Sequence, residues 1–216
     1  MELYLTDLSP NCRRVLAAIH HLGLDSETEI RNFNLFAGEH QTDEFKAINP
    51  NVKVPVLVDG DLKLWEANPI MIYLSDRQNA DTFCPSDNAA RIEVLRWMSW
   101  EVQHFNRALG EIVWETVAKQ VFGLGPVDEA KVASGQENFR RFAAVLEDHL
   151  ADREFILGDT PTVADFAVGS HSALALHPQS QVPLLEFPKV LAWLQRMEAL
   201  PAWEKTAPQA PAEAAE

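Results

Sequence analysis

The chain is poor in cysteine and in basic residues, and each shortage excludes a class of protein. It has two cysteines, Cys12 and Cys84, too few for the disulfide framework that stabilises small secreted domains. Its 18 lysine and arginine residues face 32 acidic residues, which gives a formal net charge of -14. Because nucleic acids and anionic membrane surfaces bind basic faces, we expect neither as a partner.

Long apolar runs and metal-binding patterns are also missing. No stretch reaches the roughly 20 apolar residues of a transmembrane helix, and the N-terminus lacks the basic start and apolar core of a signal peptide. No set of His, Cys, Asp and Glu residues has metal-ligand spacing. We therefore expect a cytoplasmic protein without a metal, whose 47% hydrophobic residues bury a large core.

Strand and helix patterns alternate in the first third of the chain. Strands are predicted at 3–5 and 27–33, with a helix over 10–22 between them, which together make a βαβ unit. Ser9 is a favourable N-cap for that helix, and a further short helix is predicted over 42–48. This part of the chain is therefore expected to be a compact α/β unit.

The stretch from Lys53 to Glu66 combines a hairpin with a helix start. Val56 to Val58 is a β-branched run, Asp59-Gly60 is a hairpin-turn signal, and 62–64 alternates like a half-buried strand. Glu66 then stands at the beginning of a helix, where free N–H groups attract a carboxylate. The pattern predicts an anion site directly after the hairpin.

Pro55 comes just before the first strand of that hairpin. A proline there either marks a sheet edge or holds a bend through a cis peptide bond. A bend would turn the N–H and C=O of Val54 outward, unpaired, so that an extended peptide can pair with them as a further strand would. The sequence thus predicts a backbone clamp for a peptide beside the anion site.

No strand pattern follows Ala89, so the second part of the chain is expected to be all-helical. Thr162 and Asp165 have the spacing of a capping box that begins one of its helices. The predicted helices cover 89–122, 128–150, a segment from Thr162, 187–200 and a short segment from Pro201. The predicted domain limits are 1–79, a linker at 80–87, and 88–206, followed by an Ala/Pro/Glu-rich tail at 207–216 that is expected to be disordered.

Three motifs together resemble the glutathione transferase family. Val54-Pro55 resembles its cis-proline, Glu66-Ala67-Asn68-Pro69-Ile70 resembles its Glu-Ser-x-Ala-Ile glutathione motif, and the segment from Gly158 to Asp165 resembles its C-terminal capping signature. The similarity is to theta-like and bacterial members, through Ser9-Pro10-Asn11-Cys12-Arg13, Gly38-Glu39-His40 and Lys53-Val54-Pro55. The resemblance implies a thioredoxin-like N-terminal domain, an all-helical C-terminal domain, a homodimer, and glutathione as co-substrate.

Ala67 departs from the family pattern, which has a serine there. That serine donates its hydroxyl and its N–H to the γ-glutamyl carboxylate of glutathione, and Ala67 keeps only the N–H. The lost bond is worth roughly 0.5–1.5 kcal/mol, or about 1.5–3 kcal/mol if charge-assisted. Glutathione binding is then weakened by up to about a hundredfold.

By the same resemblance, Ser9 is the catalytic hydroxyl that donates a hydrogen bond to the glutathione thiolate. Its alternative role is a plain N-cap, and one hydroxyl is not expected to serve both fully. Asn11 and Cys12 are further candidates for contact with the sulfur, since an Asn assists glutathione binding in some disulfide-reducing bacterial members and a Cys forms mixed disulfides in omega-like ones. We favour a buried, unreactive Cys12 over that thiol role.

The resemblance also assigns the residues that hold the tripeptide. Lys53 and His40 contact the glycine carboxylate of glutathione, Glu66 pairs with its α-amino group, and the backbone of Val54 and Ala67 completes the site. A local cation is needed because both the chain and its ligand are anionic.

The second-substrate pocket is expected along the helix after Ala89. The resemblance places Trp100, His104, Arg107 and Trp114 near the cleft, although helical spacing alone does not separate core tryptophans from pocket ones. Glu101 is expected to reach the glutathione of the partner subunit.

These observations predict conjugation of reduced glutathione to a small hydrophobic electrophile, as in detoxification. One alternative is a glutathione-dependent disulfide reductase or peroxidase on the same fold, which would use Asn11 or Cys12. The other is a non-enzymatic binding module of this fold, which Ala67 motivates.

Overall fold

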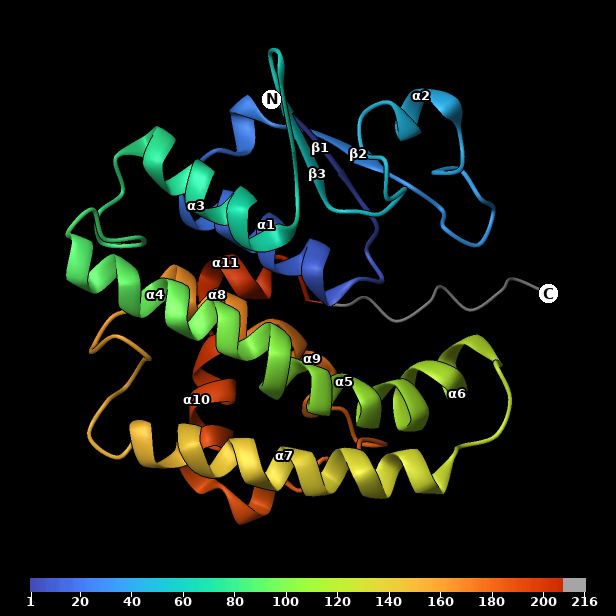
Figure 1. Cartoon of the computed structure of the whole chain (residues 1–216), viewed down its shortest axis with the longest axis vertical. Helices are drawn as coiled ribbons and strands as arrows, with labels where there is room; N and C mark the ends of the chain where they lie inside the picture. The colour runs from blue at the N-terminus through green and yellow to red at the C-terminus, as the bar shows by residue number, and fades with distance from the viewer. Residues whose placement is uncertain (208–216) are drawn as a thin grey trace.

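A four-stranded mixed sheet organises the N-terminal part of the protein. The computed structural model describes residues 1–207, and the predicted tail at 207–216 lies outside these residues except for Ala207. The strands stand in the order β2-β1-β3-β4 (Figure 1). Their bounds are β1 Glu2–Leu5, β2 Glu29–Asn32, β3 Val56–Asp59 and β4 Leu62–Trp65.

The pairing of the strands confirms the predicted βαβ unit and hairpin. β1 and β2 are parallel, whereas β3 runs antiparallel to both β1 and β4. Gly60 closes the hairpin with a φ of 58°, which glycine adopts without strain. The strand predicted at 27–33 is shorter than expected, because the 3₁₀ turn Asp25–Glu27 precedes it.

Two helices lie between the sheet and the helical domain. These are α1 Pro10–His21 and α3 Ala67–Gln78, which pack against each other and against helices of the second domain (Figure 1). The short α2 Asp43–Lys46 lies in the connection before the hairpin and begins at Thr42, whose hydroxyl accepts the N–H of Phe45. The predicted helices of this domain are therefore all present.

The helix predicted over 89–122 is one continuous rod, but it contains two π-helical turns that its sequence did not reveal. Its parts are α4 Asn88–Trp100, the π turn Glu101–Phe105, α5 Asn106–Val113, the π turn Trp114–Ala118 and α6 Lys119–Phe122. Each π turn takes up extra backbone and rotates the side chains that follow it. A regular helical wheel therefore misplaces residues on this rod.

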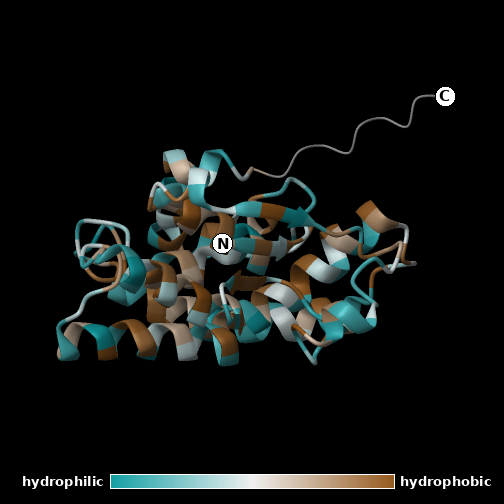
Figure 2. Cartoon of the chain, turned by 90° about the horizontal axis from the view of Figure 1, so that it is seen from above, coloured by the Kyte–Doolittle hydropathy of each residue, from teal (hydrophilic) through white to brown (hydrophobic). Residues whose placement is uncertain are grey.

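A second long helix, α7 Glu129–His149, runs beside the rod in the reverse direction (Figure 1). Apolar and polar residues alternate along the long helices (Figure 2), so that each has one face for the core. At Gly135, α7 lies so close to the rod that an added Cβ would be 2.8 Å from Ile112. None of the helices within residues 1–207 is long and apolar enough to cross a membrane.

The last helices fill the space behind the rod. Asp165 and Thr162 form the predicted capping box, and the Asp165 carboxylate also accepts hydrogen bonds from Ile156 N at 2.8 Å and from Trp193 Nε1 at 2.9 Å. The 3₁₀ turn and α9 that follow α8 were not predicted. The segments are α8 Val163–Val168, the 3₁₀ turn Gly169–His171, α9 Ser172–Ala175, α10 Pro188–Glu198 and α11 Pro201–Glu204.

Candidate active site

Ser9 stands at the N-cap of α1, and its hydroxyl has capacity for a second role. Its Oγ accepts the N–H of Cys12 at 3.4 Å, and within residues 1–207 its own O–H donates to no group. A serine oxygen has one donor hydrogen as well as acceptor lone pairs. The cap uses an acceptor and thiolate stabilisation uses the donor, so the expected conflict between the two roles is absent.

Cys12 does not fit the role of a reactive thiol. Its side chain is only 1% exposed, and burial raises the pKa of its thiol to about 11, although the N–H of Thr6, which donates to Sγ at 3.5 Å, opposes the shift. A thiol with that pKa stays protonated at neutral pH and is a poor nucleophile. Burial therefore disfavours the alternative in which Cys12 forms mixed disulfides and supports the buried, unreactive cysteine.

Asn11 is exposed in the first turn of α1, next to Ser9. Its Oδ1 accepts a hydrogen bond of 2.6 Å from Nη2 of Arg14. The NH₂ group of the same amide has no partner in the described part of the chain. Asn11 thus offers an unpaired donor beside the start of the helix.

The peptide bond between Val54 and Pro55 is cis, as the sequence suggested. Neither the N–H nor the C=O of Val54 has a backbone partner within residues 1–207. The preceding carbonyl, that of Lys53, is held by Nδ2 of Asn49 at 2.7 Å. Asn49 is almost fully buried, and it fixes the loop in a way that sequence reasoning missed.

The N-terminus of α3 faces the same region and carries an unusual backbone conformation. Glu66 has a φ of 73°, a left-handed conformation that costs about 1–3 kcal/mol for a residue other than glycine. The side chain is exposed, whereas Ala67 behind it is buried. The first turn of α3 contains no acidic side chain, so its free N–H groups are open to a carboxylate.

The two side chains predicted to bind the glycine carboxylate lie in the connection between β2 and β3. Lys53 is exposed and forms no ion pair in the described chain. His40 is half-buried, and its Nδ1 is buried without a partner. It lines a hollow of about 430 Å³ that also includes Thr42, Asp43, Lys46 and Val52. Lys46 is thus a lysine near the candidate site, besides Lys53, that sequence reasoning missed.

Glu101 is not available to a partner subunit, so that prediction is wrong. It is 1% exposed and joins three elements by its carboxylate. It accepts hydrogen bonds from Arg14 Nη1 at 2.8 Å, Asn68 Nδ2 at 3.0 Å and Asn106 Nδ2 at 2.6 Å. These residues, far apart in the sequence, tie α1 and α3 of the first domain to the long rod of the second.

The four residues predicted for the second-substrate pocket do not share one surface. Trp100 packs on the core and stacks on Phe105, and His104 stacks on Phe142 of α7 with ring centroids 4.7 Å apart. Arg107 is exposed farther along the rod. Trp114 is 50% exposed and lines a hollow of about 530 Å³ with Gly110, Glu111, Glu115, Lys131 and Ser134.

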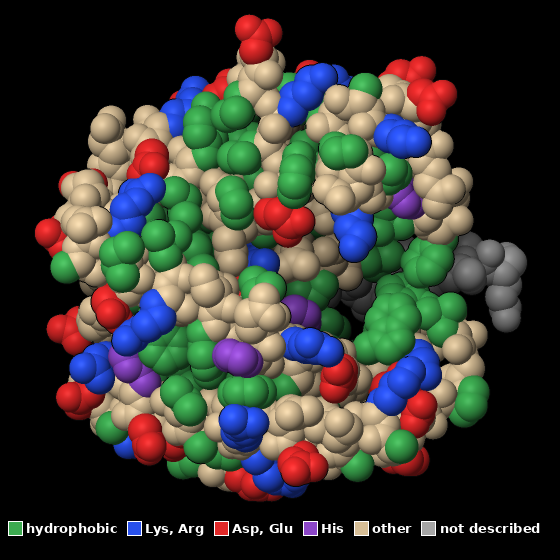
Figure 3. All heavy atoms as spheres, in the orientation of Figure 1, with side chains coloured by type: hydrophobic (Ala, Val, Ile, Leu, Met, Phe, Trp, Pro, Cys, Tyr) green, Lys and Arg blue, Asp and Glu red, His purple; other side chains and the backbone are tan. Residues whose placement is uncertain are grey.

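An aromatic contact that the sequence did not suggest bridges the two domains. Phe36, on the loop after β2, is 65% exposed, and its ring centroid lies 5.0 Å from that of Phe122 at the end of α6. Oδ1 of Asn34 accepts the N–H groups of Phe36 and Ala37 and so orders this loop. The surface is hollowed between the domains, with apolar side chains at one end of the hollow (Figure 3).

Comparison with known proteins assigns this arrangement to a family. Residues 8–77 match the family model described as "Glutathione S-transferase, N-terminal domain", and residues 128–196 match "Glutathione S-transferase, C-terminal domain". The chain belongs to the glutathione S-transferase family. The predicted fold class, a thioredoxin-like mixed sheet domain followed by a helical domain, is thereby confirmed.

Relatives that match over most of their length support this family assignment. The chain is 32% identical to glutathione S-transferase 3 of Zea mays, over 95% of this chain and 92% of the relative. It is 34% identical to glutathione S-transferase theta-2 of Rattus norvegicus, over 92% and 81%. Among solved structures, a theta class enzyme from Xanthomonas axonopodis pv. citri with glutathione bound has a TM-score of 0.84 and 26% identity, covering 98% of both chains.

Proposed function

We propose that this transferase activates reduced glutathione through the Ser9 hydroxyl and conjugates it to a small apolar electrophile. The observation that carries the proposal is the free O–H of Ser9 at the N-terminus of α1. A hydrogen-bond donor and a helix N-terminus both stabilise an anion and lower the pKa of a bound thiol. The thiolate sulfur then bonds to the electrophilic carbon, and the leaving group departs with the electron pair.

The groups around Ser9 suit the tripeptide. The unpaired backbone of Val54 pairs with its extended chain, and the N–H of Ala67 at the start of α3 receives the γ-glutamyl carboxylate. Glu66 pairs with the α-amino group, while Lys53 and His40 receive the glycine carboxylate. The Xanthomonas relative with glutathione bound supports the choice of this ligand.

The electrophile enters between the domains in this proposal. Arg107 and Trp114 remain candidates for its pocket because both are exposed on the rod, and the pair formed by Phe36 and Phe122 adds an apolar wall. Trp100 and His104 are left out, because their rings are stacked on neighbouring aromatic side chains. Detoxification of apolar compounds in the cytoplasm is the corresponding physiological role.

A homodimer is also proposed. Apolar side chains are exposed on β4, at Leu62 and Trp65, and on α4, at Ile92 and Leu95. Such residues are commonly found at interfaces between subunits. Sedimentation equilibrium of the purified protein tests this, and a monomer at micromolar concentration would exclude it.

The proposed role of Ser9 is tested with Ser9→Ala and Ser9→Thr. The first removes the hydroxyl, and we expect kcat/KM for conjugation to fall by about 10- to 150-fold, the equivalent of a charge-assisted hydrogen bond of about 1.5–3 kcal/mol. The pKa of bound glutathione, read from the ultraviolet absorbance of its thiolate, rises by the corresponding amount. Ser9→Thr keeps both cap and donor and retains most of the activity. Unchanged thiol pKa in Ser9→Ala would refute the assignment.

Calorimetric titration with reduced and oxidised glutathione separates this function from its alternatives. Binding of the reduced form in the micromolar to millimolar range supports conjugation with a weakened site. Preference for the oxidised form would instead favour a disulfide reductase that uses the exposed amide of Asn11.

A further inference from the structure

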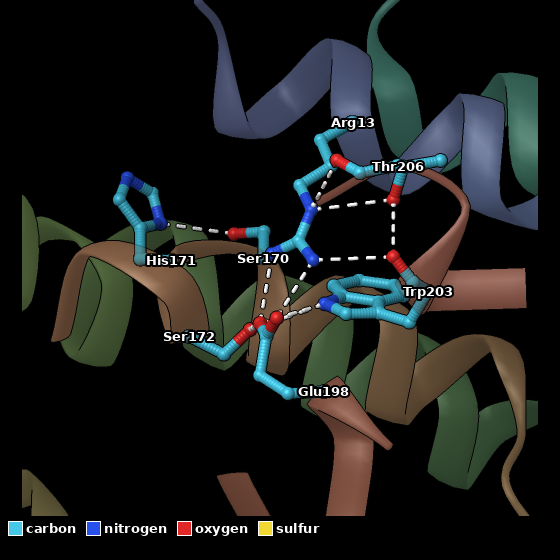
Figure 4. A network of polar contacts seen from close by, with 7 residues as sticks. All are labelled: Arg13, Ser170, His171, Ser172, Glu198, Trp203 and Thr206. Carbon is cyan, nitrogen blue, oxygen red and sulfur yellow. Dashed lines mark hydrogen bonds and ion pairs between the residues drawn. The ribbon is translucent and has the colours of Figure 1, made fainter. Parts of the chain in front are cut away.

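His171 lies where the two domains meet, although no motif in the sequence draws attention to it. It ends the 3₁₀ turn Gly169–His171, which packs against both α1 and α5. Its ring is half-buried. In Figure 4 the imidazole points away from the cluster of polar groups around Glu198, to which its neighbour Ser172 belongs.

The hydrogen bonds around Ser170 determine which ring nitrogen of His171 carries the proton. Nδ2 of Asn106 donates to Oγ of Ser170 at 3.0 Å, and the same Oγ lies 2.9 Å from Nδ1 of His171. Ser170 is buried, and in the described chain its hydroxyl has no other acceptor. Because a buried hydroxyl without an acceptor is costly, Ser170 donates to Nδ1. The proton of the neutral ring is then on Nε2.

That Nε2–H group is left without a partner among the described residues. Nε2 forms no hydrogen bond within residues 1–207 and is not one of the buried unpaired atoms, so it opens to solvent. Burial, and to a lesser degree the charge of Arg14, lowers the pKa of the imidazole to about 4. At neutral pH the ring is therefore an uncharged donor in a fixed orientation.

A missing side chain leaves room in front of this donor. A Cβ on Gly110 would lie 3.8 Å from Nε2 of His171, so any side chain larger than a methyl group would cover the N–H. Gly110 stands one helical turn before Trp114 on the rod, and both line the hollow of about 530 Å³. The donor thus lies beside Gly110, one helical turn from the exposed indole of Trp114, on a turn that packs against both α1 and α5.

We propose that the Nε2–H of His171 donates a hydrogen bond to the second substrate, in the space that Gly110 leaves open, and selects electrophiles that carry a neutral acceptor oxygen such as a nitro or carbonyl group. The inference rests on the proposed conjugating function. A donor that is left unpaired when substrate excludes water penalises an electrophile without an acceptor. An uncharged donor also favours neutral acceptors over carboxylates, whereas an arginine side chain would bind carboxylates more strongly.

The test compares para-nitrobenzyl chloride with benzyl chloride, and reports the ratio of their kcat/KM values so that intrinsic reactivity cancels between variants. His171→Phe keeps an aromatic ring without a donor, and we expect it to reduce the ratio about three- to tenfold, the effect of one neutral hydrogen bond. Gly110→Val covers the donor and reduces the ratio similarly with His171 intact. His171→Gln restores a donor and part of the ratio. His177→Gln, a change of the same kind outside the turn, leaves it unchanged. A ratio in His171→Phe equal to that of the wild type overturns the inference.

A binding experiment keeps the inference separate from the proposed function. In nitrogen NMR spectra of the labelled protein, the signals of the His171 ring are those that disappear in His171→Gln. We expect these signals to show the Nε2–H tautomer. The protein is then titrated with S-(para-nitrobenzyl)glutathione and with S-benzylglutathione, and only the first shifts the Nε2–H resonance. An Nδ1–H tautomer, or equal shifts with both conjugates, refutes the inference alone. Failure of both conjugates to bind refutes the proposed function and the inference with it.

Discussion

Replacing Glu101 by glutamine is expected to destabilise the protein strongly, because this one carboxylate joins the two domains. Both of its oxygens accept hydrogen bonds, from Arg14 and Asn68 on Oε1 and from Asn106 on Oε2. Glutamine has one acceptor oxygen, so its NH₂ group must face one of these donors and the charge opposite Arg14 is lost. The guanidinium then remains buried, only 6% exposed, without its counter-charge.

The expected magnitude follows from this burial. Breaking a buried ion pair by removing one partner costs about 3–5 kcal/mol, because an uncompensated charge is left inside. For a chain of this length that free energy corresponds to a Tm lower by about 6–20 °C. The assay is thermal and urea unfolding followed by circular dichroism and tryptophan fluorescence, at one protein concentration for all variants.

A matched control exists on the surface. Glu186 forms a bidentate pair with Arg140, but the two side chains are 49% and 46% exposed, and such pairs contribute only about 0–1 kcal/mol. Glu186→Gln makes the same chemical change in water. If Glu101→Gln unfolds at the same temperature as Glu186→Gln, the argument that Glu101 holds the domains together is wrong.

Three further predictions follow from single sites. Ala67→Ser restores the family hydroxyl, and calorimetry should show reduced glutathione bound about two- to tenfold more tightly, for one added hydrogen bond; weaker binding would mean that the buried position has no room for it. The native protein should resist alkylation by iodoacetamide at neutral pH, because both cysteines are buried and burial raises the pKa of each thiol; mass spectrometry that finds rapid labelling of Cys12 would contradict this. Burial alone would raise the pKa of the Glu198 carboxyl, but the hydrogen bonds and charge of Arg13 (Figure 4) outweigh it and hold the pKa below its ordinary value. The pair therefore stabilises the fold above the ordinary carboxyl pKa, and this stability is lost as pH falls through the lowered value. In Glu198→Gln, the free energy of unfolding should fall less steeply as the solution is made acidic. An unchanged acid dependence would show that other carboxylates cause it.

Much of the fold could be predicted because its signals are local. Capping residues such as Thr162 with Asp165, and the hairpin closed at Gly60, act within a few residues of chain. The same holds for Val54-Pro55 and for the start of α3 at Glu66. Short-range hydrogen bonds and backbone preferences decide such features, and the sequence carries them in full.

The second-substrate side was predicted less well, and the two π turns of the rod give the reason. Helical spacing assumes a constant rotation per residue, but the turns at Glu101–Phe105 and Trp114–Ala118 change it. Trp100 therefore faces the core while Trp114 faces solvent. Neither turn has a sequence signal that the periodicity could show.

The sequence by itself determined the two-domain fold, the position of Ser9 at a helix start and the cis-proline loop, since each rests on neighbouring residues. Only the tertiary structure decided that Cys12 is buried, that Glu101 is used inside the chain, and that the ring of His171 lies beside Gly110. These properties depend on burial and on partners that folding brings from distant parts of the chain. Burial sets the pKa of a thiol or an imidazole, and the available partners decide which hydrogen bonds remain free for a ligand.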